Sequence, residues 1–307
     1  MIEASVKQTI EEILPGRVLF NEPMERHTSM GVGGKTDALA FPADREELGK
    51  MLRFLGSRGV SFLPVGNCTN LIVREGGYQG VLISLRKFDG LRLQGAGNDH
   101  QYLHAESGVP LLRLVSFCLD HSLEGMEFCA GIPGSAGGAV RMNAGAWGTE
   151  MKDVVHSVFL LDGDGTEHEV ARRDLDFQYR NLDIPDGMIV TAAVFILRRG
   201  RRDEIASRIS EILMQRKSKH PVQYESAGSI FKNQAGRPAG KLIEEAGLKG
   251  RRVGNAMVSE KHANFIVNIG GARAKDVTSL IELVRDEVFR KTQVLLEPEV
   301  RVVGDEG

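Results

Sequence analysis

The chain has 307 residues, of which 36 are glycine, and its 39 lysines and arginines nearly balance its 41 aspartates and glutamates. A hydrophobic content of 42%, with only 10 prolines and no repeat of glycine at every third position, excludes a disordered or collagen-like chain. The net charge of −2 gives no general attraction for polyanions, so we expect no nucleic-acid partner. The length allows about two or three domains.

The three cysteines, Cys68, Cys118 and Cys129, are too few and too widely spaced to indicate a disulfide framework or a zinc site. Free cysteines are typical of a reducing compartment, and the N-terminal region lacks the apolar stretch of a secretory signal. The longest strongly apolar run, 188–197, is too short to span a bilayer. We therefore expect a cytoplasmic protein with no membrane segment and no metal.

Apolar residues at helical spacing predict three helices in the N-terminal part of the chain. The first covers 6–14 and ends near Pro15. The second opens with Asp44 and Glu47 at the spacing of a capping box, and the third begins at Pro110. Short apolar runs at 60–65 and 81–85 predict strands between the second and third helices.

From residue 154 onwards the helical spacing of apolar residues gives way to short strand-like runs. The runs 158–161 and 167–170 predict a hairpin, and 188–197 predicts a buried strand. After a charged stretch at 198–203, the pattern predicts helices within 205–213, 242–246 and 277–288 and strands at 265–269 and 294–303. The order of elements indicates a mixed α+β fold with a smaller C-terminal part.

Two glycine-rich stretches look like phosphate-binding loops, but their spacing matches no standard nucleotide motif. In 29–36 the first glycine of a P-loop is replaced by Ser29, and in 131–138 Pro133 stands where the dinucleotide fingerprint needs glycine. Closely spaced glycines still let backbone amides approach phosphate oxygens. The loops 66–70 and 131–138 are therefore candidates to hold a pyrophosphate from two sides, with tight turns between strands as the alternative.

A series of motifs stands in register along the chain: His27–Gly34, Pro64–Leu71, Gly131–Ala139, Met142–Gly148, Tyr179–Arg180, Ala227–Asn233 and Leu296–Arg301. Together they resemble the UDP-N-acetylenolpyruvoylglucosamine reductase family of flavoenzymes, in its shorter subtype without an extra tyrosine-bearing loop. The resemblance covers roughly residues 20–304. It implies an α+β fold in which an FAD-binding domain of the vanillyl-alcohol-oxidase (PCMH) type, 1–200, has two lobes of about 1–85 and 86–200. A smaller α+β substrate-binding domain, 201–307, follows.

The resemblance also implies the cofactors FAD and NADPH and a UDP-sugar enolpyruvyl ether as substrate. At Asn67, Cys68 and Thr69 the chain departs from the family's usual residues, although Thr69 keeps a hydroxyl. The implied FAD-binding residues are Gly66, Asn67, Cys68, Thr69, Asn70, Gly131, Ile132, Pro133, Gly134, Ser135, Gly137, Gly138, Asn143, Ala144 and Gly145.

Three catalytic residues are implied by the same resemblance. Ser229 is the expected proton donor, Arg180 the cation that faces the enolpyruvyl carboxylate, and Glu299 the carboxyl group that assists the enolate and its protonation. By composition alone these residues could be a turn serine, a surface ion pair and a solvated strand face. The implied substrate contacts are Tyr179, Lys219 and Asn233, with Lys217 as the rival of Lys219.

The leading hypothesis is therefore an NADPH-dependent flavoenzyme that reduces the enolpyruvyl group of UDP-N-acetylenolpyruvoylglucosamine to give UDP-N-acetylmuramate. One alternative is another FAD-dependent oxidoreductase on the same fold with a different substrate, which would lack the Ser229 and Glu299 pair. A second is a nucleotide-binding regulatory protein, which would not copurify with flavin. The sequence gives no indication of the oligomeric state.

Overall fold

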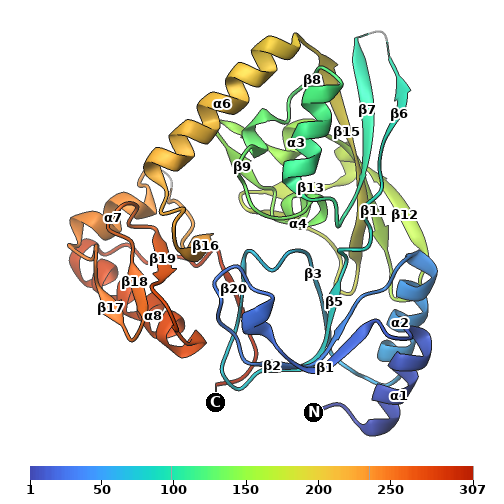
Figure 1. Cartoon of the computed structure of the whole chain (residues 1–307), viewed down its shortest axis with the longest axis horizontal. Coiled ribbons are helices and arrows are strands. Elements are labelled where there is room, and N and C mark those ends of the chain that lie inside the picture. The colour runs from blue at the N-terminus through green and yellow to red at the C-terminus, as the bar shows by residue number, and fades with distance from the viewer. Residues whose placement is uncertain (98, 235, 307) are drawn as a thin grey trace. The chain divides into compact units, whose positions relative to one another are not determined.

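The computed structural model describes residues 1–97, 99–234 and 236–306 (Figure 1). It comprises two units, each with its own hydrophobic core. The first unit consists of Met1–Leu19, Ala38–Asn67 and Gly80–Gln215, and the second of Phe20–Asp37, Cys68–Gln79 and Arg216–Gly307. Both units are discontinuous in sequence. The chain passes from one to the other within β1 Val18–Pro23, β2 Lys35–Ala40 and β5 Tyr78–Ser84, between Asn67 and Cys68, and within α6 Arg202–Lys219.

An antiparallel sheet of order β12-β11-β15-β7-β6 forms the centre of the first unit, with β8 paired to the end of β15. β15 is buried over most of its length, which explains the uninterrupted apolar run that predicted it. The strands are β6 Leu91–Ala96, β7 His100–Glu106, β8 Leu123–Glu124, β11 Val155–Leu161, β12 Glu167–Ala171 and β15 Ile189–Arg199. The predicted hairpin at 158–170 is confirmed, with Leu161 opposite Glu167.

Three helices that the apolar spacing predicted are present in the first unit. In α2 the side chain of Asp44 caps the helix by accepting a 2.9 Å hydrogen bond from the Glu47 amide. The helices are α1 Ala4–Ile13, α2 Arg45–Ser57, α3 Leu111–Asp120, α4 Ala136–Arg141, α5 Met151–Val154 and the part of α6 (Arg202–Lys219) up to Gln215, with 3-10 turns η2 Glu127–Cys129 and η3 Arg172–Asp174. Two short hairpins pair β9 Gly145–Ala146 with β10 Thr149–Glu150, and β13 Asp176–Gln178 with β14 Asn181–Asp183.

A second sheet has the order β1-β2-β5-β3 and includes the strands in which the chain changes unit. Its strands are β1 Val18–Pro23, β2 Lys35–Ala40, β3 Phe62–Val65 and β5 Tyr78–Ser84. β3 and β5 pair in parallel, and they are the two strands that the runs at 60–65 and 81–85 predicted.

The second unit has an antiparallel sheet of order β16-β19-β18-β17 and the helices α7 and α8. A parallel pair joins β4 Leu71–Val73 to β20 Arg301–Val303. The remaining elements are η1 Met24–Arg26, α7 Ala239–Glu245, α8 Ala274–Thr292, β16 Glu225–Ser229, β17 Arg252–Val253, β18 Ala256–Val258 and β19 Phe265–Asn268. The strand predicted over 294–303 is wrong in extent, because only 301–303 form a strand and Pro298 makes an isolated bridge.

The cysteines behave as core residues. Cys68, Cys118 and Cys129 are all buried and unoxidised, and burial raises the pKa of the Cys118 thiol to about 12. Within residues 1–97, 99–234 and 236–306, no helix combines the length and apolarity that a bilayer crossing needs. The expected α+β fold is confirmed.

Candidate functional site

The glycine loop 131–138 and Gly66 come together in the first unit. The Ser135 hydroxyl oxygen is buried, and no partner lies within hydrogen-bonding distance of it among the described residues. A Cβ atom at Gly66 would lie 2.5 Å from this oxygen, so the glycine lets the Ser135 hydroxyl keep this position. A buried hydroxyl without a partner is uncommon in proteins. This arrangement fits a bound group that reaches Ser135, as the phosphates of a dinucleotide would.

Some backbone amides of the same loop are already used by the protein. The Ala136 amide donates to the Val109 carbonyl at 2.8 Å, and the Gly137 amide donates to the Ser107 carbonyl at 3.0 Å. These bonds fix the start of α4 to the end of β7. A phosphate contact by this loop must therefore come from its other groups, of which the Ser135 hydroxyl is one.

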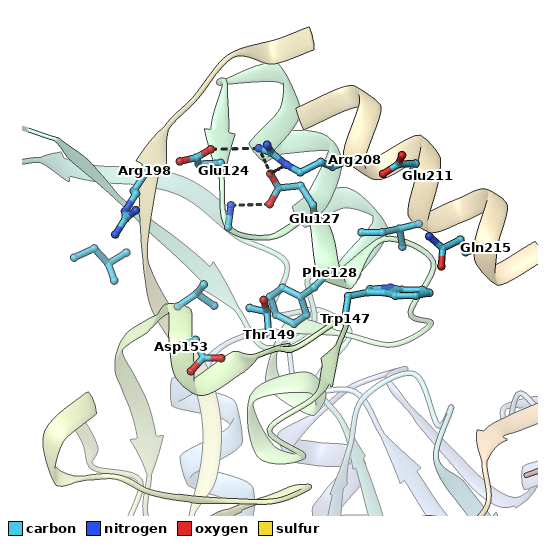
Figure 2. A pocket seen from close by; sticks show the side chains of 14 residues that line it. Glu124, Glu127, Phe128, Trp147, Thr149, Asp153, Arg198, Arg208, Glu211 and Gln215 are labelled. Atoms are coloured by element: carbon cyan, nitrogen blue, oxygen red, sulfur yellow. Dashed lines mark hydrogen bonds and ion pairs between the residues drawn. The ribbon is translucent and has the colours of Figure 1, made fainter. Parts of the chain in front are cut away.

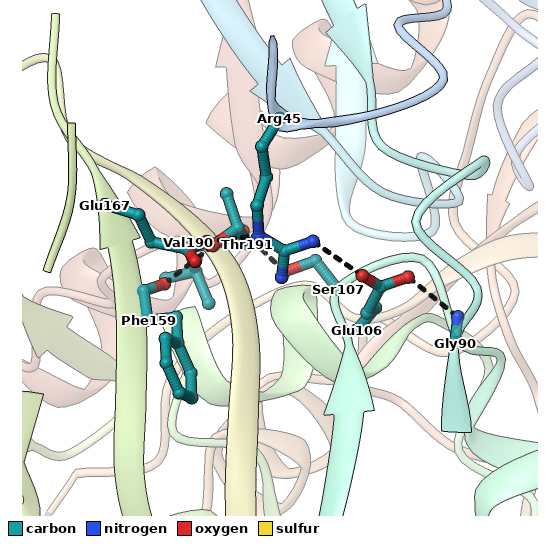
Figure 3. A network of polar contacts seen from close by, with 8 residues as sticks. All are labelled: Arg45, Gly90, Glu106, Ser107, Phe159, Glu167, Val190 and Thr191. Carbon is teal, nitrogen blue, oxygen red and sulfur yellow. Dashed lines mark hydrogen bonds and ion pairs between the residues drawn. The ribbon is translucent and has the colours of Figure 1, made fainter. Parts of the chain in front are cut away.

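A network of hydrogen bonds and ion pairs surrounds Ser107 and the preceding residue, Glu106 (Figure 3). The Ser107 hydroxyl donates to the Val190 carbonyl at 2.5 Å, and the preceding residue, Glu106, accepts from Arg45 at 2.6 Å. Arg45 also donates to Glu167 at 2.5 Å, which links α2, β7 and β12. Burial opposes ionisation of Glu106, but the hydrogen bonds from Arg45 and the Gly90 amide outweigh it and lower the pKa of the carboxyl group.

Glu106→Gln should lower the free energy of unfolding by about 1–3 kcal/mol near neutral pH, since hydrogen bonds to charged groups contribute on that order. Because the folded-state pKa is depressed, this stabilisation is present above the ordinary value of 4.5 and is lost as the pH falls through the folded pKa. Urea unfolding between about pH 3 and pH 7 should show the two proteins converging in acid. Glu46→Gln, in an exposed pair with Lys50, is the control, and an equal loss in both variants would contradict the prediction.

Asn143 joins the segment 143–145 to the hairpin that carries Arg180. Asn143 is fully buried; its amide nitrogen donates to Glu150 at 3.0 Å and to the Gln178 carbonyl at 2.8 Å, and its oxygen accepts from the Lys152 amide. The side chain that we predicted as an FAD contact is therefore occupied by the protein itself. Asn143 fixes the position of the hairpin, and cofactor contacts by 143–145 would fall to the backbone.

Arg180 occupies the turn between β13 and β14. Its backbone has φ of +58°, a left-handed conformation that is uncommon outside glycine. The guanidinium donates to the Gly145 carbonyl at 3.2 Å and lies 5.1 Å from the ring centroid of Tyr179, which is 43% exposed. The structure thus places Arg180 beside the predicted FAD segment 143–145 and beside one predicted substrate contact.

A cleft of about 760 Å³ lies in the first unit and contains none of the site residues that we predicted (Figure 2). It is lined by Trp147 from the loop after β9 and by Arg208, Glu211 and Gln215 from α6. Arg208 donates to Glu127 at 2.7 Å and to Glu124 at 3.2 Å, so two carboxylates of the same cleft neutralise its positive charge. Trp147, the single tryptophan of the sequence, is exposed in this cleft and was not predicted as a site residue.

In the second unit, Ser229 and Glu299 are held at neighbouring positions. Ser229 ends β16 opposite Phe265 of β19, directly after Gly228, whose φ is +74°. The amide of Glu299 donates a 2.7 Å hydrogen bond to the carbonyl of Ile230, the residue after Ser229. Both side chains are half-buried. Residues distant in sequence therefore present a hydroxyl and a carboxyl group from adjacent backbone segments.

Asn70 belongs to the same cluster as Glu299. Its side-chain amide donates to the Glu299 carbonyl at 3.0 Å, and its own carbonyl accepts from the Arg301 amide at 2.9 Å. Glu297, the other carboxylate on this face, is exposed and paired with Lys232. The predicted cofactor loop residue Asn70 thus supports the backbone of the predicted catalytic Glu299, whereas Glu297 forms a surface ion pair.

The glycines at 31–34 serve packing inside the second unit. A side chain at Gly34 would collide with the carbonyls of Arg74 and Glu75, and one at Gly31 with the carboxylate of Glu225. A strand, β2, follows these glycines instead of the helix that a P-loop requires. The interpretation of 29–36 as a nucleotide loop is accordingly excluded.

The predicted substrate contacts of the second unit lie at the surface. Lys219 is the exposed last residue of α6. Asn233 is also exposed, and its side-chain oxygen accepts a 3.0 Å hydrogen bond from the Ala239 amide at the start of α7. Beside Lys219, burial and then the neighbouring Arg216 lower the pKa of His220 to about 4, so this imidazole is neutral near pH 7. The positive charge of this segment comes from its lysines and arginine.

Comparison with known proteins matches both parts of the chain. Residues 36–171 match the FAD binding domain family, and residues 220–303 match the family of the UDP-N-acetylenolpyruvoylglucosamine reductase C-terminal domain. The reductase of that name from Syntrophus aciditrophicus is 50% identical, covering 98% of this chain and 97% of that protein, and the one from Caldanaerobacter subterraneus is 42% identical, covering 99% and 100%.

A solved structure agrees with these relatives. The crystal structure of UDP-N-acetylenolpyruvylglucosamine reductase (MurB) from Thermus caldophilus superimposes with a TM-score of 0.79 at 36% identity, covering 93% of this chain and 97% of that one. Such identity over nearly the whole length, together with the fold described above, shows that the chain belongs to the UDP-N-acetylenolpyruvoylglucosamine reductase family.

Proposed function

We propose that this protein reduces the enolpyruvyl group of UDP-N-acetylenolpyruvoylglucosamine with NADPH, giving UDP-N-acetylmuramate for peptidoglycan precursor synthesis. Membership of the family makes the chain an FAD-dependent oxidoreductase. The observation that carries the proposal for the chemistry is the hydrogen bond from the Glu299 amide to the Ile230 carbonyl, which holds a hydroxyl and a carboxyl group on adjacent segments. The three cysteines, none of which forms a disulfide in the described structure, favour a cytoplasmic location for the reaction.

FAD, when bound, would supply the redox chemistry, which is hydride transfer from NADPH to the enolpyruvyl β-carbon. Addition of that hydride breaks the π bond and leaves an electron pair at the α-carbon, shared with the carboxylate. Ser229 then donates its hydroxyl proton to the α-carbon, and solvent restores that proton afterwards. Glu299 assists the enolate and its protonation, and Arg180 stabilises the carboxylate, since a guanidinium binds a carboxylate through two parallel hydrogen bonds.

We assign FAD binding to 1–200, in lobes of about 1–85 and 86–200, and substrate binding to 201–307. The family matches at 36–171 and 220–303 support this division. Ser135, which lies against Gly66, is the group best placed for a cofactor phosphate, together with the other predicted loop residues. Tyr179, Lys219 and Asn233 are the proposed substrate contacts, with lysine supplying charge for the diphosphate.

The test is a flavin titration followed by two anaerobic half-reactions. The purified protein should show flavin absorption bands, bleach on addition of NADPH, and recover its colour when the enolpyruvyl sugar nucleotide is added. A preparation that neither contains FAD nor binds it would contradict the proposal. A reduced protein that this sugar nucleotide fails to reoxidise would favour a different substrate.

A further inference from the structure

Asn264 is a buried asparagine that holds the chain directly after Ser229. Its carbonyl accepts from the Ile230 amide at 2.9 Å, its side-chain oxygen accepts from the Phe231 amide at 3.0 Å, and its side-chain nitrogen donates to the Phe231 carbonyl at 2.8 Å. Asn264 is 4% exposed and Phe231 is 1% exposed, so water has little access to replace these bonds. Each buried group left without a partner would cost about 1–3 kcal/mol.

The Asn264 side chain continues a β-ladder that the backbone alone cannot complete. The ladder between β16 and β19 is irregular between Ser226 and Ser229 and has its last pair at Ser229 and Phe265. One carboxamide carries both the donor and the acceptor that Phe231 needs, whereas aspartate lacks the donor and leucine lacks both groups.

The segment held by Asn264 also carries the backbone of Glu299. The Glu299 amide donates to the Ile230 carbonyl at 2.7 Å, and the Lys232 amide donates to the Glu297 carbonyl at 2.8 Å. Residues 230–232 therefore lie between Asn264 and the strand-like segment 297–299, with Phe231 bridging Pro298. Any displacement of this segment moves the attachment points of both Ser229 and Glu299.

We propose that Asn264 is a positioning residue that fixes Ser229 and Glu299 in the geometry needed for proton transfer to the substrate. It acts through the backbone of Ile230 and Phe231 and has no assigned contact with the substrate. The inference rests on the proposed function, because it concerns the second half-reaction. A displacement of about 1 Å at a reacting group can slow a reaction by about 10²-fold.

The test compares Asn264→Asp with Asn268→Asp at the other end of β19. Asn268 is the control because it is similarly buried, at 6% exposed, and similarly hydrogen-bonded. Its nitrogen donates to the Met30 carbonyl at 3.0 Å and to the Glu225 carboxylate at 3.1 Å, and its oxygen accepts from the amides of Gly270 and Ala272. For Asn264→Asp we expect normal FAD content and normal flavin reduction by NADPH, with reoxidation by the substrate slowed by about 10–10²-fold. For Asn268→Asp we expect a comparable loss of melting temperature but both rates within about twofold of the unaltered chain.

A double-mutant cycle with Ser229→Ala separates positioning from general destabilisation. If Asn264 acts through Ser229, Asn264→Asp should slow reoxidation far less in the Ser229→Ala background than in the unaltered chain. Full additivity, or equal slowing in the Asn264 and Asn268 variants, would overturn the proposal. If Asn264→Asp fails to fold, Asn264→Ser against Asn268→Ser gives the same comparison under the same criteria. If the substrate cannot reoxidise the reduced flavin of the unaltered chain, the proposed function is contradicted and this inference with it. A fully active Asn264→Asp variant contradicts this inference alone.

Discussion

In Ser229→Ala, NADPH should reduce the bound flavin as fast as in the unaltered chain, while reoxidation by the enolpyruvyl sugar nucleotide slows by about 10²–10⁴-fold, the range for a lost general acid. In the proposed mechanism Ser229 has no part in taking electrons from NADPH, and it supplies the proton that completes reduction of the double bond. A serine hydroxyl is a weak acid, yet it suffices when the acceptor is a strongly basic carbon and the site is partly shielded from water. Ser229 is half-buried, which meets the second condition.

Stopped-flow measurement of the two half-reactions distinguishes this role from a structural one. Ser226→Ala is the control, because it removes a hydroxyl from the same strand, β16, three positions earlier. We expect Ser226→Ala to leave both rates within about twofold, the effect of an ordinary surface change. Equal slowing of both half-reactions in Ser229→Ala would exclude Ser229 as the proton donor.

Elements whose signals are local were predictable from the sequence. The helix at 45–57 was predictable from its capping residue, Asp44, whose side chain caps the helix in the structure. The hairpin at 155–171 was predictable from two short strand-like runs on either side of the glycine-containing turn 162–165. In both cases the partners are close in the chain. Local propensity and the hydrophobic period then suffice to specify the element.

The segment 294–303 shows what local signals cannot predict. Leu296 and Val300 are buried, as the alternation predicts, but Pro298 has no amide to donate to a ladder, so regular pairing is confined to Arg301–Val303. Before that point the segment pairs with 230–232. The sequence pattern describes which side chains are buried and cannot name a partner strand so far away.

The candidate site also contains some features that the sequence indicated and others that only the folded chain reveals. Glycine clustering drew attention to both 31–34 and 131–138, and only the contacts distinguish them: Gly34 is enclosed by its own unit's carbonyls, whereas Gly66 lies against an unsatisfied Ser135 hydroxyl. Asn264 gave no sequence signal, because a polar residue before a short strand is ordinary. Its importance arises from Ile230 and Phe231, which only the folded chain brings to it.

Arg180→Lys should lower turnover by about 10²–10³-fold, the loss seen when one donor that stabilises a developing anion is removed, although the positive charge is kept. The guanidinium can keep its 3.2 Å hydrogen bond to the Gly145 carbonyl and still offer a planar pair of N–H groups to a carboxylate. A lysine ammonium is a single point charge on a flexible stem, and it has to choose between these partners. Flavin reduction by NADPH should change little, so the loss should appear in reoxidation.

Arg172→Lys provides the matched control for this substitution. Its guanidinium lies 4.8 Å from the Phe177 ring centroid, as that of Arg180 lies 5.1 Å from Tyr179, and it donates to the Lys152 and Leu175 carbonyls at 2.9 and 3.3 Å. Arg172→Lys therefore weakens a cation–ring contact and hydrogen bonds to backbone carbonyls, as Arg180→Lys does, but at a residue outside the predicted site. We expect Arg172→Lys to lose some thermal stability and to keep kcat/KM within about twofold. Near-normal reoxidation in Arg180→Lys would leave Arg180 with a structural role in the turn, and a parallel loss in Arg172→Lys would trace both effects to the hairpin.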